Sequence, residues 1–158
     1  MKNFDKESAV IYARKHALKY NPDYMSFKGL GGDCTNYISQ CLLAGGGVMN
    51  YSNNGWFYVD SNNRAPSWTG VNFLTNFLLA NKTPGFRVET IKKENLQIGD
   101  IVQIRQNPNR FNHTMIVTKA YSGKVFVSAH SNDCLDKPLD DYKYIEIMCL
   151  RIIGVNEW

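Results

Sequence analysis

One cysteine directly follows a glycine-rich turn and begins a predicted helix, in the segment Gly31-Gly32-Asp33-Cys34-Thr35-Asn36-Tyr37-Ile38-Ser39-Gln40. Backbone N–H groups at a helix start have no intrahelical partners, and together with the helix dipole they favour a thiolate over a thiol. The sequence therefore predicts that Cys34 ionises readily and acts as a nucleophile. The N–H of Cys34 itself is the expected donor to an oxyanion, because such groups are already oriented where negative charge develops.

A cysteine nucleophile needs a general base, and the chain contains three histidines. His113 precedes the predicted strand 114–121, and His130 ends the predicted strand 124–130. Ser122-Gly123 is typical of a tight turn that joins two such strands into a hairpin. Because the far ends of hairpin strands meet, we expect His113 to lie near His130 and the residues that follow it.

A third polar group would hold the imidazole of His113 in the tautomer and orientation that proton transfer requires. The sequence offers His130, Asn132 and Asp133 for this role, and we favour His130 because it stands nearest the end of its strand. His16 lies among charged residues of the first predicted helix and is interpreted as a solvated surface residue.

Composition limits the class of protein. The chain has 158 residues and is 44% hydrophobic, which suffices for one well-filled core and predicts a single domain over residues 1–158. The net charge of +4 is spread along the chain, which disfavours a nucleic-acid partner but suits an anionic polymer such as a cell wall. We expect a monomer.

No apolar run is long enough to cross a membrane, and the first residues are too polar for a secretory leader. We therefore expect that the chain does not insert into a membrane. We also expect that it is synthesised in the cytoplasm without a signal peptide. If the protein acts outside the cell, for example on the anionic polymer of a cell wall, it would reach that place after release or delivery, or as a domain of a longer secreted protein.

The remaining cysteines, Cys41, Cys134 and Cys149, lie in or beside apolar segments and lack the spacing of a zinc site or a Cys-x-x-Cys redox pair. We expect them to be reduced and mostly buried. No metal or other cofactor is expected, because a thiolate attacks its substrate directly.

Apolar periodicity predicts helices first and strands afterwards. The helices are expected at about 4–19, 34–44 and 71–81, and the strands at 101–105, 114–121, 124–130 and 144–153. Residues 49–67 are rich in Asn, Ser and Gly yet carry three adjacent aromatics, which indicates an irregular segment that packs or binds something. This order predicts an α+β domain with N-terminal helices packed on a C-terminal antiparallel sheet.

Several blocks of the sequence resemble the amidase domain of bacterial cell-wall enzymes and phage lysins, a papain-like group that also holds the CHAP and NlpC/P60 peptidases. The resemblance covers nearly the whole chain, and its blocks are Asp5 to Tyr24, Gly31 to Gln40, Ser67-Trp68, Leu96 to Gln103, His113 to Lys119 and His130 to Leu139. It implies a papain-like fold, Cys34 as the nucleophile and His113 as the base that later protonates the leaving amine.

The resemblance also implies a role at the site for Tyr24, which matches an upstream tyrosine of NlpC/P60 enzymes, although a packing role is equally open. Asp33 is placed beside the nucleophile, and its alternative interpretation is a helix N-cap that points away from the thiol. Trp56 and Trp68 could line a groove for a glycan or a peptide stem, or serve as core residues.

The sequence thus predicts a metal-independent cysteine hydrolase that cleaves an amide bond of peptidoglycan through an acyl-enzyme. The bond is either the N-acetylmuramoyl-L-alanine linkage or one within the stem peptide. Two alternatives stay open: a catalytically silent wall-binding module in which Cys34 is structural, and an acyl or amide transferase of the same fold.

Overall fold

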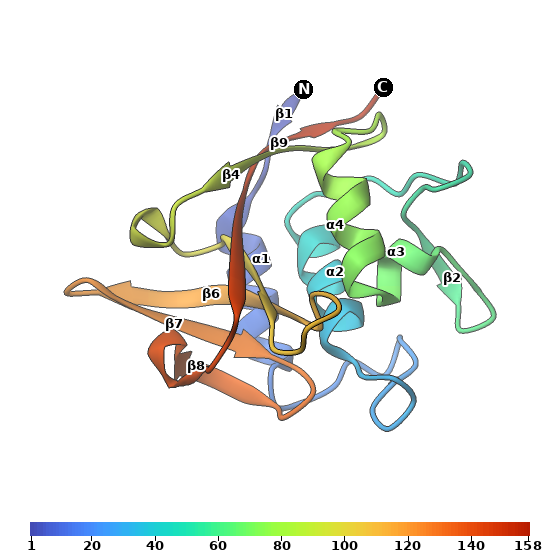
Figure 1. Ribbon diagram of the computed structural model, residues 1–158. Helices are drawn as coiled ribbons and strands as arrows, with labels where there is room; N and C mark the ends of the chain where they lie inside the picture. Colours follow the sequence, from blue (N-terminus) through green and yellow to red (C-terminus); the bar gives the residue numbers. More distant parts are fainter.

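An antiparallel sheet with helices packed against one face forms the framework of the chain in the computed structural model, which describes all 158 residues (Figure 1). Its strands are β1 (Lys2–Asn3), β4 (Gly85–Ile91), β5 (Ile101–Arg105), β6 (His113–Tyr121), β7 (Lys124–Ala129), β8 (Cys134–Pro138) and β9 (Glu146–Asn156). Their order is β1-β9-β5-β6-β7-β8, and β4, which lies off this path, also pairs with β9. The predicted mixture of helices and a mainly antiparallel sheet is confirmed.

The helices are α1 (Lys6–His16), α2 (Cys34–Ala44), α3 (Pro66–Thr69) and α4 (Val71–Leu79). Helix α1 begins where Asp5 accepts a capping bond from the Ser8 N–H (3.0 Å), and it ends earlier than predicted, so that Leu18 is exposed. Helix α2 has the predicted bounds, because Gly46 follows it with a φ of 102°, a backbone conformation that suits glycine. None of the helices has the length and apolar character that a membrane span requires.

The predicted hairpin of β6 and β7 is present. Ser122 and Gly123 both have positive φ angles, 52° and 73°, which is the geometry of a tight two-residue turn between twisted strands. Ile116 pairs with Ser128, and the register shifts between Val117 and Lys119. The hairpin therefore brings the start of β6 next to the residues that follow β7.

Alternate residues of the sheet supply two cores. Ile116 of β6 packs with Trp56 and Trp68 in the core beneath the helices, whereas Met115 and Val117 pack on the opposite face. Two short 3-10 turns, Lys93–Asn95 and Leu139–Asp141, lie beside that second core. Side-chain direction along β6 thus decides which residues can face helix α2.

Residues 49–67 contain a small hairpin of β2 (Tyr58–Asp60) and β3 (Asn63–Arg64), which projects beside α3 (Figure 1). We expected this segment to be irregular, and neither the hairpin nor α3 was predicted from the sequence. All four cysteines are free. Cys41 and Cys149 are buried as predicted, while Cys134 is only half-buried.

Candidate active site

Cys34 is the first residue of helix α2, as predicted, and its side chain is only 7% exposed. Gly31 and Gly32 lead into the helix with φ angles of 98° and 104°, which side-chain-bearing residues rarely adopt. A Cβ on Gly32 would lie 3.1 Å from Ser131 Oγ, so this turn packs closely against the loop that follows β7. The Asp33 N–H donates to the same Ser131 hydroxyl (3.0 Å), which fixes the approach of the chain to Cys34.

The surroundings of the Cys34 thiol differ from the sequence prediction. Burial raises the pKa of Cys34 above its ordinary value, and the nearby Asp33 carboxylate raises it further. Hydrogen bonds from the Thr114 backbone and from Thr35 lower the pKa but do not outweigh burial. The prediction that this helix start yields a readily ionised cysteine is therefore wrong for the resting protein, because desolvation dominates.

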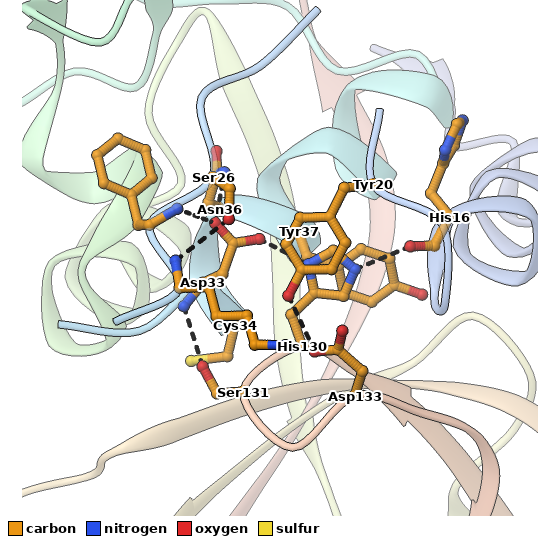
Figure 2. Close-up of polar contacts among 12 residues, drawn as sticks. His16, Tyr20, Ser26, Asp33, Cys34, Asn36, Tyr37, His130, Ser131 and Asp133 are labelled. Carbon is orange, nitrogen blue, oxygen red and sulfur yellow. Dashed lines mark hydrogen bonds and ion pairs between the residues drawn. The ribbon is translucent and has the colours of Figure 1, made fainter. Parts of the chain in front are cut away.

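Asp33 occupies the N-cap position of α2 but makes no capping bond to the helix backbone. Its Oδ1 accepts from the Phe27 N–H (2.7 Å) and from Asn36 Nδ2 (2.9 Å), and its Oδ2 lies 2.6 Å from His130 Nδ1 (Figure 2). The carboxylate is 1% exposed. It therefore organises the loop ahead of Cys34 and has no surface open to a substrate.

His130 has both ring nitrogens engaged, and neither contacts His113. Nε2 lies 2.8 Å from the His16 carbonyl oxygen, which can only accept, so Nε2 carries a proton. Nδ1 lies within hydrogen-bond distance of the Asp33 carboxylate, so the imidazole and the carboxylate form a buried hydrogen-bonded pair. The ring is stacked between Tyr20 and Tyr37, with centroids 3.9 and 4.1 Å away (Figure 2). His130 thus joins α1, α2 and the loop after β7.

Removing the Asp33 carboxylate should destabilise the folded protein. Asp33→Ala would leave the N–H of Phe27, the amide of Asn36 and the buried His130 ring without their shared hydrogen-bond partner. We expect the free energy of unfolding to fall by about 3–5 kcal/mol, because each buried polar group left without its partner costs about 1–3 kcal/mol. Urea denaturation measures it, with Asp23→Ala as an exposed control; a loss below about 1 kcal/mol would contradict the network.

His113 is the first residue of β6 and is 7% exposed. It lines a cavity of about 320 Å³ together with Ser131, Asn132, Lys137 and Tyr142. Burial and, to a smaller extent, the positive charge of Lys137 lower the pKa of His113 to about 4. The imidazole is therefore neutral near pH 7 and able to accept a proton.

The structure brings the Cys34 thiol to the start of β6 without joining it to the His113 imidazole. The sulfur interacts with the backbone of Thr114, and the Thr35 and Thr114 hydroxyls lie 3.1 Å apart. Consecutive strand residues point to opposite faces, so His113 extends toward Tyr142, whose ring centroid is 6.0 Å away. No hydrogen bond links the two candidate catalytic side chains.

Asn132 lies in the same cavity as His113, as the hairpin predicted, and has a φ angle of 66°. Ser131 precedes it with a φ angle of 64°, so two consecutive left-handed residues turn the chain back toward β8. Asp133 instead accepts from the Tyr20 hydroxyl (2.9 Å). Of the three residues considered for orienting His113, only Asn132 lines the cavity.

Trp56 and Trp68, for which the sequence left open a ligand groove or the core, lie in the core. Trp56 and Trp68 are fully buried, and their indole N–H groups donate to Ser39 Oγ and Asn36 Oδ1, each at 3.0 Å. Tyr24 is half-buried, with its ring stacked 6.0 Å from that of Trp68. Trp68 thus supports Asn36, which in turn holds Asp33, so its connection to Cys34 is indirect.

Four polar residues at this site were given no role in the sequence prediction: Thr35, Asn36, Thr114 and Lys137. Ser131 was expected near His113, but its contact with Asp33 was not predicted. Thr35 and Asn36 belong to the quoted cysteine segment, and Thr114 directly follows His113. Closeness in sequence to the candidate catalytic residues was the only feature that could have indicated their role at the site. The contact of the Ser131 loop with Gly32 depends on tertiary packing and left no mark on the local sequence.

Lys137 gives a direct test of the charge that acts on His113. Its ammonium lies 4.4 Å from the centroid of the Tyr142 ring at the edge of the cavity. Lys137→Met keeps the aliphatic contact but removes the positive charge, so the pKa of His113 should rise from about 4 toward its ordinary value. NMR titration of the imidazole measures this shift.

The matched control is Lys119→Met, because Lys119 also lies over a tyrosine ring, that of Tyr121, and is absent from the lining of the cavity. It should leave the His113 titration unchanged. An unchanged or lowered pKa in Lys137→Met would contradict the inferred electrostatics.

Comparison with known proteins agrees with the amidase resemblance. The chain is 37% identical over 136 residues to "Uncharacterized protein YhbB" of Bacillus subtilis (strain 168), covering 82% of this chain and 42% of that protein. It is 30% identical over 148 residues to "Uncharacterized protein YjcM" of the same organism, covering 87% of this chain and 33% of that protein. The chain therefore spans less than half the length of these relatives.

No solved structure shows significant similarity to this chain. A sequence model of the family described as "Putative amidase domain" matches residues 3–153, which include the cysteine segment, His113 and His130. Because the match extends over nearly the whole chain, this protein belongs to that amidase domain family.

Proposed function

We propose that this protein is a papain-like cysteine amidohydrolase, related to the CHAP and NlpC/P60 peptidases, that cleaves an amide bond in bacterial peptidoglycan. The observation that carries the proposal is the position of Cys34 on the first turn of α2, against the start of the strand that begins with His113. Membership of the amidase family supports amide hydrolysis. The net charge of +4 suits approach to an anionic wall.

Both catalytic groups would be uncharged before reaction. The pKa of the Cys34 thiol is raised, and that of His113 is lowered to about 4. The His113 imidazole would therefore take the thiol proton as the sulfur attacks the amide carbonyl, rather than form an ion pair in advance. This step requires the His113 side chain to turn from the Tyr142 side of β6 toward the sulfur.

The remaining steps follow from acyl transfer. A bond forms between Cys34 Sγ and the carbonyl carbon, and the carbonyl oxygen becomes an oxyanion that the Cys34 N–H at the helix start can bind. His113 gives the proton to the departing amine, and the carbon–nitrogen bond breaks. Water, deprotonated by the same imidazole, then releases the carboxylic acid and restores the thiol. Asn132, which lines the same cavity as His113, would orient the imidazole.

Digestion of purified sacculi tests this proposal. Mass spectrometry of the soluble fragments should reveal new amino termini that Cys34→Ala does not produce. A free amine on alanine with intact glycan would indicate the N-acetylmuramoyl-L-alanine amidase, and a cut between amino acids would indicate an endopeptidase. Fragments with new reducing sugar ends and no new amines would contradict amide cleavage.

A further inference from the structure

A cavity of about 620 Å³ is separate from the candidate active site. The loop at 51–57, the start of α3 and one side of α4 form it, and it shares no residue with the His113 cavity. This volume is within the range of small-ligand sites. It lies in the segment that the sequence marked as irregular and aromatic, a segment for which the proposed reaction gives no role.

Aromatic side chains border this groove and are exposed to water. Phe73 of α4 is 59% exposed and Tyr51 is 66% exposed. Phe57 lies beside Tyr51, with ring centroids 5.2 Å apart. Exposed ring faces grouped around a cavity present flat apolar surfaces of the kind on which a sugar ring can stack.

Three asparagine side chains also line the groove, Asn53, Asn54 and Asn76, and all are exposed. None of their amide groups is hydrogen-bonded within the chain, unlike that of the neighbouring Asn50, which bonds the Pro84 carbonyl (2.9 Å). Each amide can donate two hydrogen bonds and accept others. Together they offer the mixed donors and acceptors that hydroxyl and acetamido groups require.

The charged side chains that line the groove are all positive. Arg64 and Lys82 line it, and no carboxylate does. The Arg64 guanidinium is held in place, with Nε donating to Thr69 Oγ1 (3.2 Å) and Cζ lying 4.4 Å from the centroid of the Phe27 ring. Lys82 forms no ion pair in the structure. Two cations without acidic neighbours favour a ligand that carries negative charge.

We propose that this groove binds a segment of an acidic polysaccharide, with sugar rings on the aromatic side chains and a carboxylate or phosphate at Arg64 and Lys82. The Phe27 ring beneath Arg64 belongs to the residue whose N–H bonds Asp33, next to Cys34. One end of the groove is therefore connected to the loop that carries the nucleophile. A polymer held there would raise the concentration of its amide bonds near Cys34.

Binding to sacculi tests this inference separately from catalysis. The experiment uses Cys34→Ala protein, so that the sacculi stay intact, and measures the dissociation constant by cosedimentation. Adding Phe73→Ala or Lys82→Met to that protein should weaken binding about tenfold each, because one aromatic contact and one cation are lost. Tyr121→Ala is the matched control, since Tyr121 is 56% exposed on the β6–β7 hairpin, away from the groove.

Sacculi stripped with hydrofluoric acid, which removes phosphate polymers, distinguish the two sources of negative charge. Loss of groove-dependent binding after stripping assigns the ligand to a phosphate polymer, and retention assigns it to a carboxylate-bearing glycan; both support an acidic polysaccharide. The inference is overturned if Phe73→Ala and Lys82→Met bind as well as their parent, or if Tyr121→Ala weakens binding equally. Groove-dependent binding without amide cleavage by the unmodified protein would contradict the proposed function alone.

Discussion

Replacing Cys34 by alanine should abolish amide cleavage in sacculi while leaving the fold intact. In the proposed mechanism Cys34 supplies the atom that bonds to the substrate carbonyl, and no other thiol lies at a helix start. Loss of a catalytic nucleophile lowers kcat by a factor on the order of 10³ to 10⁶ in enzymes of this type. Release of new amines over time measures the effect.

Cys149→Ala serves as the control for this experiment, because Cys149 is also a buried free thiol but lies in β9 on the sheet face opposite the helices. It should retain activity near that of the unmodified protein. An unchanged circular dichroism spectrum should accompany both variants. Cleavage by Cys34→Ala at a comparable rate would place the nucleophile elsewhere.

His113→Gln should be nearly as damaging, with a loss in kcat on the order of 10² to 10⁴. The imidazole is the one basic group that lines the cavity at the start of β6 and is neutral near pH 7. Because base and nucleophile act as a unit, Cys34→Ala/His113→Gln should be no less active than Cys34→Ala alone. His16→Gln is the control, since its role in the His130 network uses the backbone carbonyl.

The role of His113 as the base also predicts how kcat/KM depends on pH. A base accepts a proton only when it is unprotonated, so kcat/KM should fall as the pH drops through the pKa of His113, at about 4 in the free protein. The loss should therefore occur below the ordinary histidine range of about 6.5. An acidic limb near pH 6.5, or full activity of His113→Gln, would contradict the assignment of the base.

Local sequence predicted the elements that carry the two candidate catalytic residues. Helix α2 was bounded correctly because glycines on both sides cannot continue a helix, and the β6–β7 hairpin because Ser122-Gly123 fits its turn. The direction of the side chains was harder to predict. Ile116 pairs with Ser128, so by continuation Ser131, not His130, lies opposite His113.

That register explains why His130 does not orient His113. Being one residue away from Ser131, His130 points to the other face of the sheet, where Asp33 and the His16 carbonyl meet it. The predicted strand included His130, but nothing in its composition fixed the pairing. Burial of Cys34 was likewise beyond prediction, because it depends on tertiary packing, including the contact of its sulfur with Thr114 of β6.

For the aromatic residues too, the sequence did not predict which side chains are buried. Trp56 and Trp68 carry indole N–H groups that find buried acceptors on α2, which allows them to enter the core fully. The exposed rings of the neighbouring groove are Tyr51 and Phe73 instead. Composition indicated aromatic residues suited to binding in this region but could not distinguish those that pack inward from those that face water.

The central claim is that Cys34 becomes acylated during turnover. Rapid acid quenching of the protein during reaction with peptidoglycan fragments, followed by peptide mass spectrometry, measures this directly. The account predicts a hydroxylamine-sensitive thioester adduct on the peptide that contains Cys34, absent from Cys34→Ala and far less abundant in His113→Gln. An adduct on any other residue would contradict it, as would amide cleavage at the same rate by Cys34→Ala.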